Sequence, residues 1–342
     1  MELRGHKFPD EVLLRRAEEL TPQFRIRSGE PTDSDAKVFA ELLNAQYARK
    51  VTPAHYLWHF ARSSSPTLSL FAECGDKPAA AYCLWILRYH AGKDCLVGCP
   101  TDLVIAPEFR FTGLYVRLQL TIEQMARKAG CACVYGSPNE AAARALTSTP
   151  GWRFMEPRTT FIAQAKPSSK PKCVSVVATN QFGAEVDDVC NRFEDAHSDR
   201  ILCRRSAEHL NWRFQKNARY AYDLFVVHQD NKPFGYLVLK TFRDSTTGET
   251  SGDIVDVLWS KENRSSLEEV LFFALSHFHA KGVSRVATWL QTNTLLDKAA
   301  AEVGFAETSL KRPFCCKVLE DSYRWLGDSN RWFVTMADVD IY

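Results

Sequence analysis

The chain has 342 residues, which is enough for two or three domains of ordinary size. It is 45% apolar and 25% charged with a net charge of +2, so it lacks the basic excess of nucleic-acid-binding or membrane-surface proteins. Its first twenty residues are charged and no apolar run has the length of a transmembrane helix, so we expect a cytoplasmic protein without a membrane or nucleic-acid partner.

The predicted elements of the first half follow a simple order. A helical extension over 1–21 is followed by a helical segment with the sequence HYLWHF at 55–60. Two β-rich runs, LSLFAEC and AAAYCLWILRYH, flank the turn GDKP and predict a hairpin. A strand (TDLVIA), an amphipathic helix (YVRLQLTIEQMARKAG) and a further strand (CACVYG) come next. This βαβ order implies a parallel pair with a right-handed crossover, within a mixed sheet.

The second half repeats that order after AKPSSKPK, a Pro-, Ser- and Lys-rich linker. HYLWHF at 55–60 matches HLNWRF at 209–214, a shift of 154 residues (209 − 55). The same shift aligns Tyr82 with Tyr236, Asp102 with Asp256 and Asn139 with Asn293; Gly151 and Gly304 differ by 153. We therefore expect two copies of one fold. The boundaries predicted are an N-terminal helical extension (1–21), a first domain (22–165), a linker (166–172) and a second domain (173–342).

Eleven cysteines are scattered along the chain. Most lie in apolar, strand-like runs and their spacing gives no complete zinc pattern, so we interpret them as buried, reduced thiols.

The loop RFTGLY between the strand TDLVIA and the following helix is the main candidate for chemistry. A helix N-terminus offers amide N–H groups without intrahelical partners and the positive end of a dipole, which suits a pyrophosphate. Gly113 would let the backbone approach such a ligand and adopt a positive φ. By itself, one glycine before a helix is also typical of an ordinary capping turn.

The loop also resembles motif A of the GNAT acyltransferase superfamily, Arg/Gln-x-x-Gly-x-Gly/Ala. Arg110 and Gly113 match, and Leu114 fills the free position. Tyr115 stands where the family has Gly or Ala, and Phe111 replaces a common Gly. The preceding strand, the amphipathic helix and the next strand, which ends in YGSPN, stand in GNAT order, and the resemblance covers nearly the whole chain, once in each half.

The resemblance implies an α/β (α+β) fold with two tandem GNAT-like domains, each a mixed twisted sheet flanked by helices with a central splayed parallel strand pair. In that family the pantetheine arm of acetyl- or another acyl-coenzyme A lies in the splay, where unpaired strand groups can bond its amides. By resemblance, Val104 and Ile105 would make those bonds through their backbones. The pyrophosphate loop would comprise Arg110, Phe111, Thr112, Gly113, Leu114 and Tyr115.

Asn139, after the second strand of the pair, has two interpretations. The resemblance gives it a side-chain contact with the cofactor, whereas its place before EAAARAL is typical of a helix N-cap.

The second copy lacks the loop's defining residue. Its loop reads SKENRSSLEEV, with Arg264 present but no glycine where Gly113 stands in the first copy. The segment 293–305 keeps the spacing of GNAT motif B. We expect a degenerate copy that no longer binds coenzyme A and helps to build the acceptor site or a homodimer contact.

Acyl transfer to an amine needs a neutral amine, a stabilised oxyanion and a leaving thiol. Asp102 occupies the strand position from which many GNAT enzymes use an acidic base, but its recurrence as Asp256 equally favours a structural role. Leu146 stands where many members have a general-acid Tyr, and Ser137 and Tyr135 are weaker candidates near the strand end. The catalytic candidates are therefore Asp102 and Ser137.

No metal site is expected. His55 and His59 are four residues apart, as metal ligands on a helix can be, but HYLWH lacks the Glu of the zincin pattern. The neighbouring Trp58 and Phe60 favour a packed helix with surface histidines.

The tandem arrangement, YGSPN and the closing RWFVTMADVDIY resemble two-domain GNAT proteins of bacterial polysaccharide loci, which acylate an amino group of nucleotide-linked sugars. Such an acceptor would use aromatic and basic residues, for which KRPFCCK and RYAYD are candidates, although either segment is equally consistent with solvated surface. An N-acyltransferase for another small amine (an antibiotic or a mycothiol-like compound), a transfer-RNA-dependent ligase and a non-catalytic acyl-coenzyme A-binding protein are the alternatives.

Overall fold

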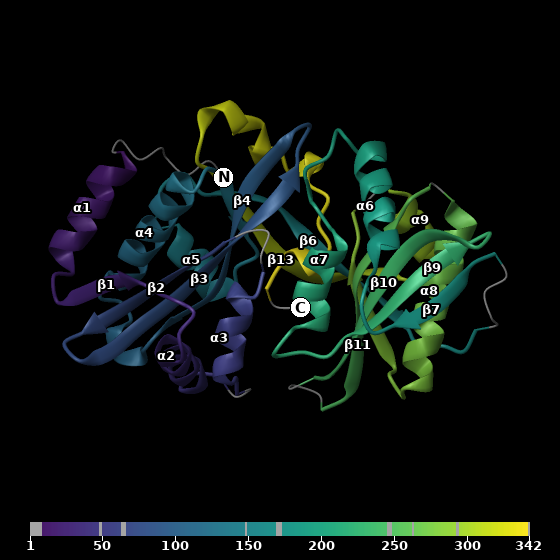
Figure 1. Ribbon diagram of the computed structural model, residues 1–342, viewed down its shortest axis with the longest axis horizontal. Coiled ribbons are helices and arrows are strands. Elements are labelled where there is room, and N and C mark those ends of the chain that lie inside the picture. The colour runs from purple at the N-terminus through teal and green to yellow at the C-terminus, as the bar shows by residue number, and fades with distance from the viewer. Residues whose placement is uncertain are drawn as a thin grey trace. The chain divides into compact units, whose positions relative to one another are not determined.

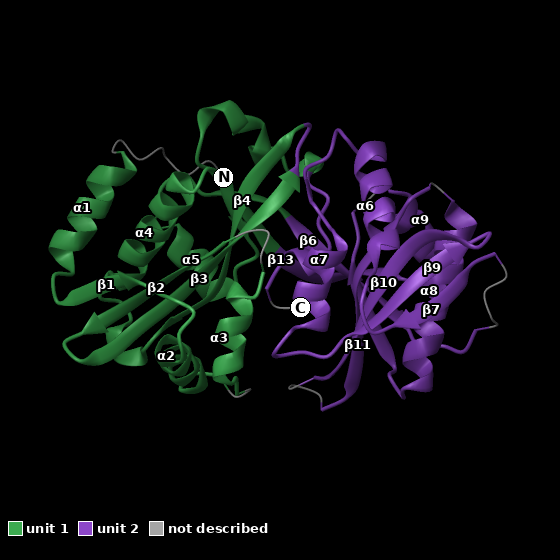
Figure 2. Ribbon diagram, in the orientation of Figure 1, with its two compact units in different colours: residues 1–89, 93–156, 313–331 green, residues 90–92, 157–312, 332–342 purple. Residues whose placement is uncertain are grey.

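The computed structural model describes residues 9–47, 50–62, 66–147, 149–168, 173–244, 248–261, 263–291 and 294–340. The chain divides into two compact units, shown in green and purple in Figure 2. Unit 1 comprises residues 1–89, 93–156 and 313–331; unit 2 comprises 90–92, 157–312 and 332–342. Among the described helices, none is long and apolar enough to cross a membrane.

The first half of the chain contains the elements that the sequence predicts, in the same order (Figure 1). They are α1 (Asp10–Leu20), β1 (Phe24–Ser28), α2 (Asp33–Asn44), α3 (Pro53–Phe60), β2 (Thr67–Cys74), β3 (Lys77–His90), β4 (Asp94–Ile105), the short helix η1 (Pro107–Phe109), α4 (Leu114–Lys128), β5 (Cys131–Gly136), α5 (Glu140–Leu146) and β6 (Arg153–Gln164). Of the predicted extension over 1–21, α1 accounts for the helical part, and residues 1–8 lie outside the described residues.

The second half repeats this series. Its elements are β7 (Ser175–Thr179), α6 (Ala184–Ala196), β8 (Leu202–Cys203), α7 (Ala207–Leu210) with η2 (Asn211–Gln215), β9 (Asp223–Gln229), β10 (Lys232–Arg243), β11 (Thr250–Trp259), α8 (Arg264–Ala280), β12 (Arg285–Trp289), α9 (Leu295–Val303) and β13 (Ala306–Val318), followed by η3 (Asp321–Gly327), η4 (Ser329–Arg331) and η5 (Met336–Asp338). The aligned residues Tyr82 and Tyr236 lie on β3 and β10, and Asp102 and Asp256 lie on β4 and β11. Asn293, the predicted counterpart of Asn139, lies outside the described residues.

Each unit has a six-stranded mixed sheet, and the sixth strand comes from the other half of the chain. The order is β1-β2-β3-β4-β5-β13 in unit 1 and β7-β9-β10-β11-β12-β6 in unit 2. The second part of β13 pairs antiparallel with β5 (Cys315 opposite Gly136), and β6 pairs antiparallel with β12 (Gln164 opposite Arg285). The units therefore differ from the boundaries predicted at 165 and 173, because residues 157–165 belong to unit 2 and residues 313–331 to unit 1.

A buried ion pair holds the exchanged strand β13 in unit 1. The Lys317 ammonium lies 2.6 Å from Glu123 on α4 and 2.9 Å from Asp10 on α1. Trp152 and Gln119 donate hydrogen bonds to the same Glu123 carboxylate, at 2.7 and 2.8 Å. Because every polar group of this buried cluster has a partner, the charge is tolerated in the core.

The linker predicted at 166–172 is described only in part. Lys166 donates a hydrogen bond to the Val303 carbonyl, so the first residue of the segment is packed onto unit 2. Residues 169–172 lie outside the described residues.

The helices of unit 1 cover both faces of its sheet, as Figure 1 shows for α2 and α3 on one side and α4 on the other. Phe39 and Tyr56 of α2 and α3 pack against Phe71, Cys83 and Val104 of the strands. On the other face, α4 buries its apolar side in a second cluster with β2, β3 and β5. Alternate residues of β4 serve the two faces, as the period of a strand requires.

The prediction of buried, reduced thiols is confirmed. All eleven cysteines are free and nine of them are buried. Burial raises the pKa of the Cys95 thiol to about 11 and that of Cys131 to about 12, so these thiols stay protonated at neutral pH.

Candidate functional site

The parallel strands β4 and β5 pair only at their beginnings. Leu96, Val97 and Gly98 are opposite residues 131–134. The strands then continue to Ile105 and Gly136 without further pairing between them in this fully described stretch. This confirms the predicted splay, which we call the β4–β5 gap; backbone groups along it can bond an inserted chain.

Val104 and Ile105 lie on the part of β4 that no longer pairs with β5. The Val104 side chain is buried in the cluster with α2 and α3, whereas Ile105 packs against the α4 cluster. Both side chains are therefore used by the core, and only the backbone of these residues can serve a ligand, as the sequence analysis expects.

The loop after β4 leads into α4, whose N-terminus has no side-chain cap. Gly113, the N-cap residue of α4, has φ 88° and ψ −7°, a left-handed conformation that favours glycine. No side chain caps this end of the helix. The amides of Leu114, Tyr115 and the next residue thus belong to a first turn without intrahelical acceptors, at the positive end of the helix dipole.

The side chains of the loop support its backbone. Arg110 donates to the Ile105 carbonyl (Nε to O, 3.3 Å) and contacts Gln46, and the Thr112 hydroxyl donates to the Phe109 carbonyl at 2.8 Å. Leu114 is fully buried and Tyr115 is partly buried against the same core cluster. Tyr115, which departs from the motif that the sequence resembles, is therefore a packing residue. Only its backbone amide is available to a ligand at the loop.

Phe111 is the strained residue of the loop. Its φ is 63° and its side chain is fully exposed. A left-handed conformation costs a non-glycine residue about 1–2 kcal/mol. A glycine at this position would adopt the same conformation without that cost.

Asn139 and Ser137 both make local hydrogen bonds. The Asn139 side chain accepts from the Ala142 amide at 2.9 Å and caps α5, as one of its two interpretations requires. The Ser137 hydroxyl donates to the Pro313 carbonyl of the exchanged strand at 2.9 Å.

Asp102 lies on the part of β4 that no longer pairs with β5, and its carboxylate contacts two histidines of α3. The Nε2 atoms of His55 and His59 lie 2.8 and 3.1 Å from the same oxygen, Oδ2, of Asp102. His55 is 3% and His59 0% exposed. The prediction of surface histidines is therefore wrong. The helix α3 packs with both histidines turned inward, where the Asp102 carboxylate provides a hydrogen-bond partner for each ring.

The hydrogen bonds fix the tautomer of His59. The Trp85 indole, which can only donate, gives its N–H to His59 Nδ1 at 2.8 Å. Nδ1 therefore carries the lone pair, Nε2 carries the hydrogen, and that hydrogen points to Asp102.

Three ligand atoms of this cluster lie within 4.8 Å of one another, a spacing at which a metal ion could bind. However, His59 Nε2 cannot offer a lone pair to a metal while Nδ1 accepts from Trp85. The donor set of these three side chains thus fits a hydrogen-bonded cluster better than a metal centre.

The cluster controls the charge of Asp102. Burial by itself would raise the pKa of this carboxyl, but the hydrogen bonds from His55 and His59 outweigh it and hold the pKa well below its usual range. A general base at neutral pH needs the opposite direction. Asp102 is therefore suited to staying an anion and attracting a cation.

In unit 2 the parallel pair also separates, but a side-chain hydrogen bond crosses the start of its gap. β11 and β12 pair over 251–253 and 285–287, and beyond this the Thr288 hydroxyl donates to the Ile254 carbonyl at 3.0 Å. Val134, the residue of unit 1 aligned with Thr288, lies opposite Gly98 in the paired stretch and has no hydroxyl.

The helix that follows is also capped. The Asn263 side chain accepts from the Ser266 amide at the start of α8. Arg264, predicted to stand in the loop like Arg110, is instead the first residue of α8 and pairs with Glu268 and Glu302. These contacts support the prediction that this copy has lost its coenzyme A site.

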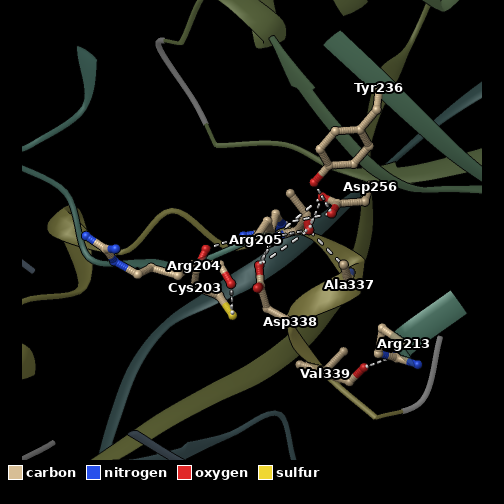
Figure 3. A network of polar contacts seen from close by, with 10 residues as sticks. Cys203, Arg204, Arg205, Arg213, Tyr236, Asp256, Ala337, Asp338 and Val339 are labelled. Atoms are coloured by element: carbon tan, nitrogen blue, oxygen red, sulfur yellow. Dashed lines mark hydrogen bonds and ion pairs between the residues drawn. The ribbon is translucent and has the colours of Figure 1, made fainter. Parts of the chain in front are cut away.

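Asp256, the counterpart of Asp102, is part of the fully buried network drawn in Figure 3. Arg205 lies 2.8 Å from Asp256 Oδ2 and 2.8 Å from Asp338 Oδ2. Tyr236 and Thr335 donate to Asp256 at 2.7 and 2.9 Å. The network ties η5 to β11, so this aspartate has a structural role.

No protein-family model and no curated protein matches the sequence. Solved structures do match. A GCN5-related N-acetyltransferase from Kribbella flavida is 16% identical, with a TM-score of 0.59 over 87% of this chain and 72% of that one. N-myristoyltransferase of Saccharomyces cerevisiae, solved with bound myristoyl-CoA, is 12% identical, with a TM-score of 0.60 over 86% of this chain and 82% of that one.

The third similar structure is a GCN5-related glucosamine N-acetyltransferase region of a fungal multi-domain β-N-acetylglucosaminidase. It is 14% identical, with a TM-score of 0.59 over 86% of this chain and 38% of that one. At these identities the likeness concerns the fold. The order of the elements, the splayed parallel pair in each unit and the extent of these matches show that the chain has the GNAT fold.

Proposed function

We propose that this protein is an acyl-coenzyme A-dependent N-acyltransferase and that unit 1 carries the reaction. The observation that carries the proposal is the joint occurrence of an open β4–β5 gap and an uncapped α4 N-terminus. In unit 2 a hydrogen bond from the Thr288 hydroxyl crosses the start of the gap, and the helix is capped by Asn263. A pantetheine arm with a pyrophosphate matches the two vacant sets of backbone groups in unit 1.

The cofactor residues of the proposal act through the backbone. Val104 and Ile105 would pair with the pantetheine amides, and the amides of 110–115 would face the pyrophosphate. Asn139 would add its side-chain amide while its oxygen caps α5.

The chemistry proposed is direct transfer. The acceptor ammonium approaches the Asp102 carboxylate and loses one proton to solvent. Its nitrogen then forms the N–C bond with the thioester carbonyl, the C–S bond breaks, and the second N–H proton ends on the thiolate. A thiol with a pKa of about 8.5 leaves readily without a dedicated acid. Ser137 is the second proposed catalytic residue, at the open end of β5.

We further propose a nucleotide-linked amino sugar as the acceptor. The sequence resemblance supports it, and one similar structure is described as a glucosamine acetyltransferase. Of the two basic segments, KRPFCCK contributes Lys317 to the buried pair with Glu123, so this lysine is structural, while Lys311 and Arg312 are exposed. In RYAYD, the Tyr220 ring contacts two cations, Arg219 at 5.1 Å and Lys240 at 3.7 Å from the ring centroid, and this cluster remains a candidate for ligand contact.

A thiol-release assay tests the proposal. Acetyl-, 3-hydroxybutyryl- and myristoyl-coenzyme A would be combined with nucleotide amino sugars, free glucosamine, an aminoglycoside and a mycothiol precursor. Turnover with a nucleotide amino sugar supports the full proposal, and turnover with another amine supports only the N-acyltransferase. Calorimetric binding of acyl-coenzyme A without turnover on any amine would identify a non-catalytic binding protein.

A further inference from the structure

Asp102 has an unusual backbone conformation for a strand residue. Its φ is 46°, whereas Asp256 on β11 does not adopt a positive φ. A non-glycine residue in this region persists only where its surroundings determine it, and the local change of direction re-aims the side chain. The two imidazole N–H groups on one carboxylate oxygen are such a determinant.

The cluster carries one negative charge, and it lies on Asp102. His59 is neutral because its Nδ1 accepts from Trp85. The Nδ1 atom of His55 is buried without a hydrogen-bond partner, so a second proton there would leave a charged donor unsatisfied. Burial raises the pKa of the neighbouring Cys83 thiol on β3 well above its usual range, so it adds no charge.

Access to this charge differs between the units. The Asp102 side chain is 12% exposed, while those of His55 and His59 are 4% and 0% exposed. Asp256 is 0% exposed and lies against the permanent cation of Arg205. The same strand position thus presents a partly exposed carboxylate in unit 1 and an enclosed one paired with a guanidinium in unit 2.

We propose that His55 and His59 are positioning residues, whose Nε2–H groups hold Asp102 ionised and turned toward the incoming acceptor amine in the unpaired part of β4. This inference rests on the proposed function. Neither imidazole touches the substrate or takes a proton in the reaction. In unit 2 the corresponding carboxylate is held by the Arg205 guanidinium, which is a cation. In unit 1 the two imidazoles are neutral donors, which orient the Asp102 carboxylate without opposing its charge.

The first experiment needs no turnover. The protein labelled with ¹⁵N-histidine is observed by NMR at pH 7, with assignments from the single variants His55→Gln and His59→Gln. We expect both rings as Nε2–H tautomers whose N–H signals shift together in Asp102→Asn. An imidazolium or an Nδ1–H tautomer at either position would overturn the proposal.

The second experiment measures kcat/KM against pH for the best acceptor amine. His59→Phe removes the donor and should lower kcat/KM about 10- to 100-fold, the cost of a misplaced catalytic group. It should also move the acid limb of the profile to higher pH, because the carboxylate loses a stabilising hydrogen bond. His59→Gln, which keeps a donor, should stay within about threefold of the wild type.

A matched control lies in unit 2, where His277 Nε2 contacts Asp223 Oδ2 at 3.1 Å. His277→Phe should leave kcat/KM and its pH profile unchanged. Equal loss in His59→Gln and His59→Phe without a shifted acid limb would indicate a merely structural histidine and refute the proposal. Failure of the wild type to bind acyl-coenzyme A would refute the proposed function, and the NMR result would then still decide the geometry of the cluster.

Discussion

Units 1 and 2 have the same series of strands and helices but treat the same three positions differently. Where unit 1 has Gly113 without a side-chain cap, unit 2 has Asn263, which caps its helix. The strand gap of unit 2 is crossed at its start by a hydrogen bond from the Thr288 hydroxyl, whereas the aligned residue of unit 1 is Val134. Asp102 is held by imidazoles and Asp256 by a guanidinium. The same fold thus leaves one helix N-terminus without a side-chain cap in unit 1 and satisfies the corresponding end by Asn263 in unit 2.

The largest expected effect concerns the buried network of Asp256 in unit 2. Arg205→Met leaves Asp256 and Asp338 buried without their cation, which typically costs about 3–5 kcal/mol. Urea unfolding at pH 7 measures the loss, with Arg264→Met, in an exposed ion pair of the same unit, as the control expected to change little. A loss in Arg205→Met no larger than that of the control would contradict a structural role for this network.

The next effect concerns the loop at Gly113, before the N-terminus of α4. Gly113→Glu introduces a side chain at φ 88° and a negative charge beside the proposed pyrophosphate, so acyl-coenzyme A affinity should fall more than about 100-fold. Calorimetry measures it. Gly304→Glu is the matched control, since Gly304 is also left-handed (φ 106°) but ends α9 of unit 2. Tight binding by Gly113→Glu would show that the site lies elsewhere.

A smaller effect is expected from the Thr288 hydrogen bond in unit 2. Thr288→Val removes one buried hydrogen bond and should lower the free energy of unfolding by about 1 kcal/mol. It should not create a second coenzyme A site, because Asn263 still caps α8. A stoichiometry of two in calorimetry would mean that this hydrogen bond alone closes unit 2, and the comparison of the helix ends would then be irrelevant.

The effect expected to be smallest near neutral pH appears on acidification. The pKa of Asp102 is lowered in the folded state, so its stabilisation is present above its unfolded pKa of about 4 and is lost as the pH falls further. Asp102→Asn should therefore show a shallower loss of stability below pH 4 than the wild type.

For Asp338 in unit 2 we expect the opposite dependence of stability on pH, because its pKa is raised in the folded state. Burial raises its pKa and Asp256 adds to this, while Arg205 opposes it, so its contribution is present below about pH 4 and falls as the pH rises. Parallel slopes for Asp102→Asn and Asp338→Asn in urea titrations at pH 2–6 would refute this assignment of the two carboxylates.

Much of the fold could be predicted because the chain repeats itself. HYLWHF and HLNWRF, Tyr82 and Tyr236, and Asp102 and Asp256 share one offset, and local patterns gave the hairpins and the βαβ units in the correct order. The loop around Gly113 could also be located, because a glycine before a helix has a known conformational use. Offset alone was misleading for Arg264, since the loop of unit 2 is shorter and the residue falls in the helix.

Sequence by itself determined the two copies, their element order and the asymmetry of the glycine, since these depend on local pattern and on comparison within the chain. Only the tertiary structure decided which strand closes each sheet, because β6 and β13 carry similar patterns and the choice depends on contacts such as Lys317 with Glu123, 194 residues apart. It also decided the surroundings of Asp102. Whether a histidine on an amphipathic helix faces water or a carboxylate depends on the helix's rotation against the sheet, which no local pattern specifies.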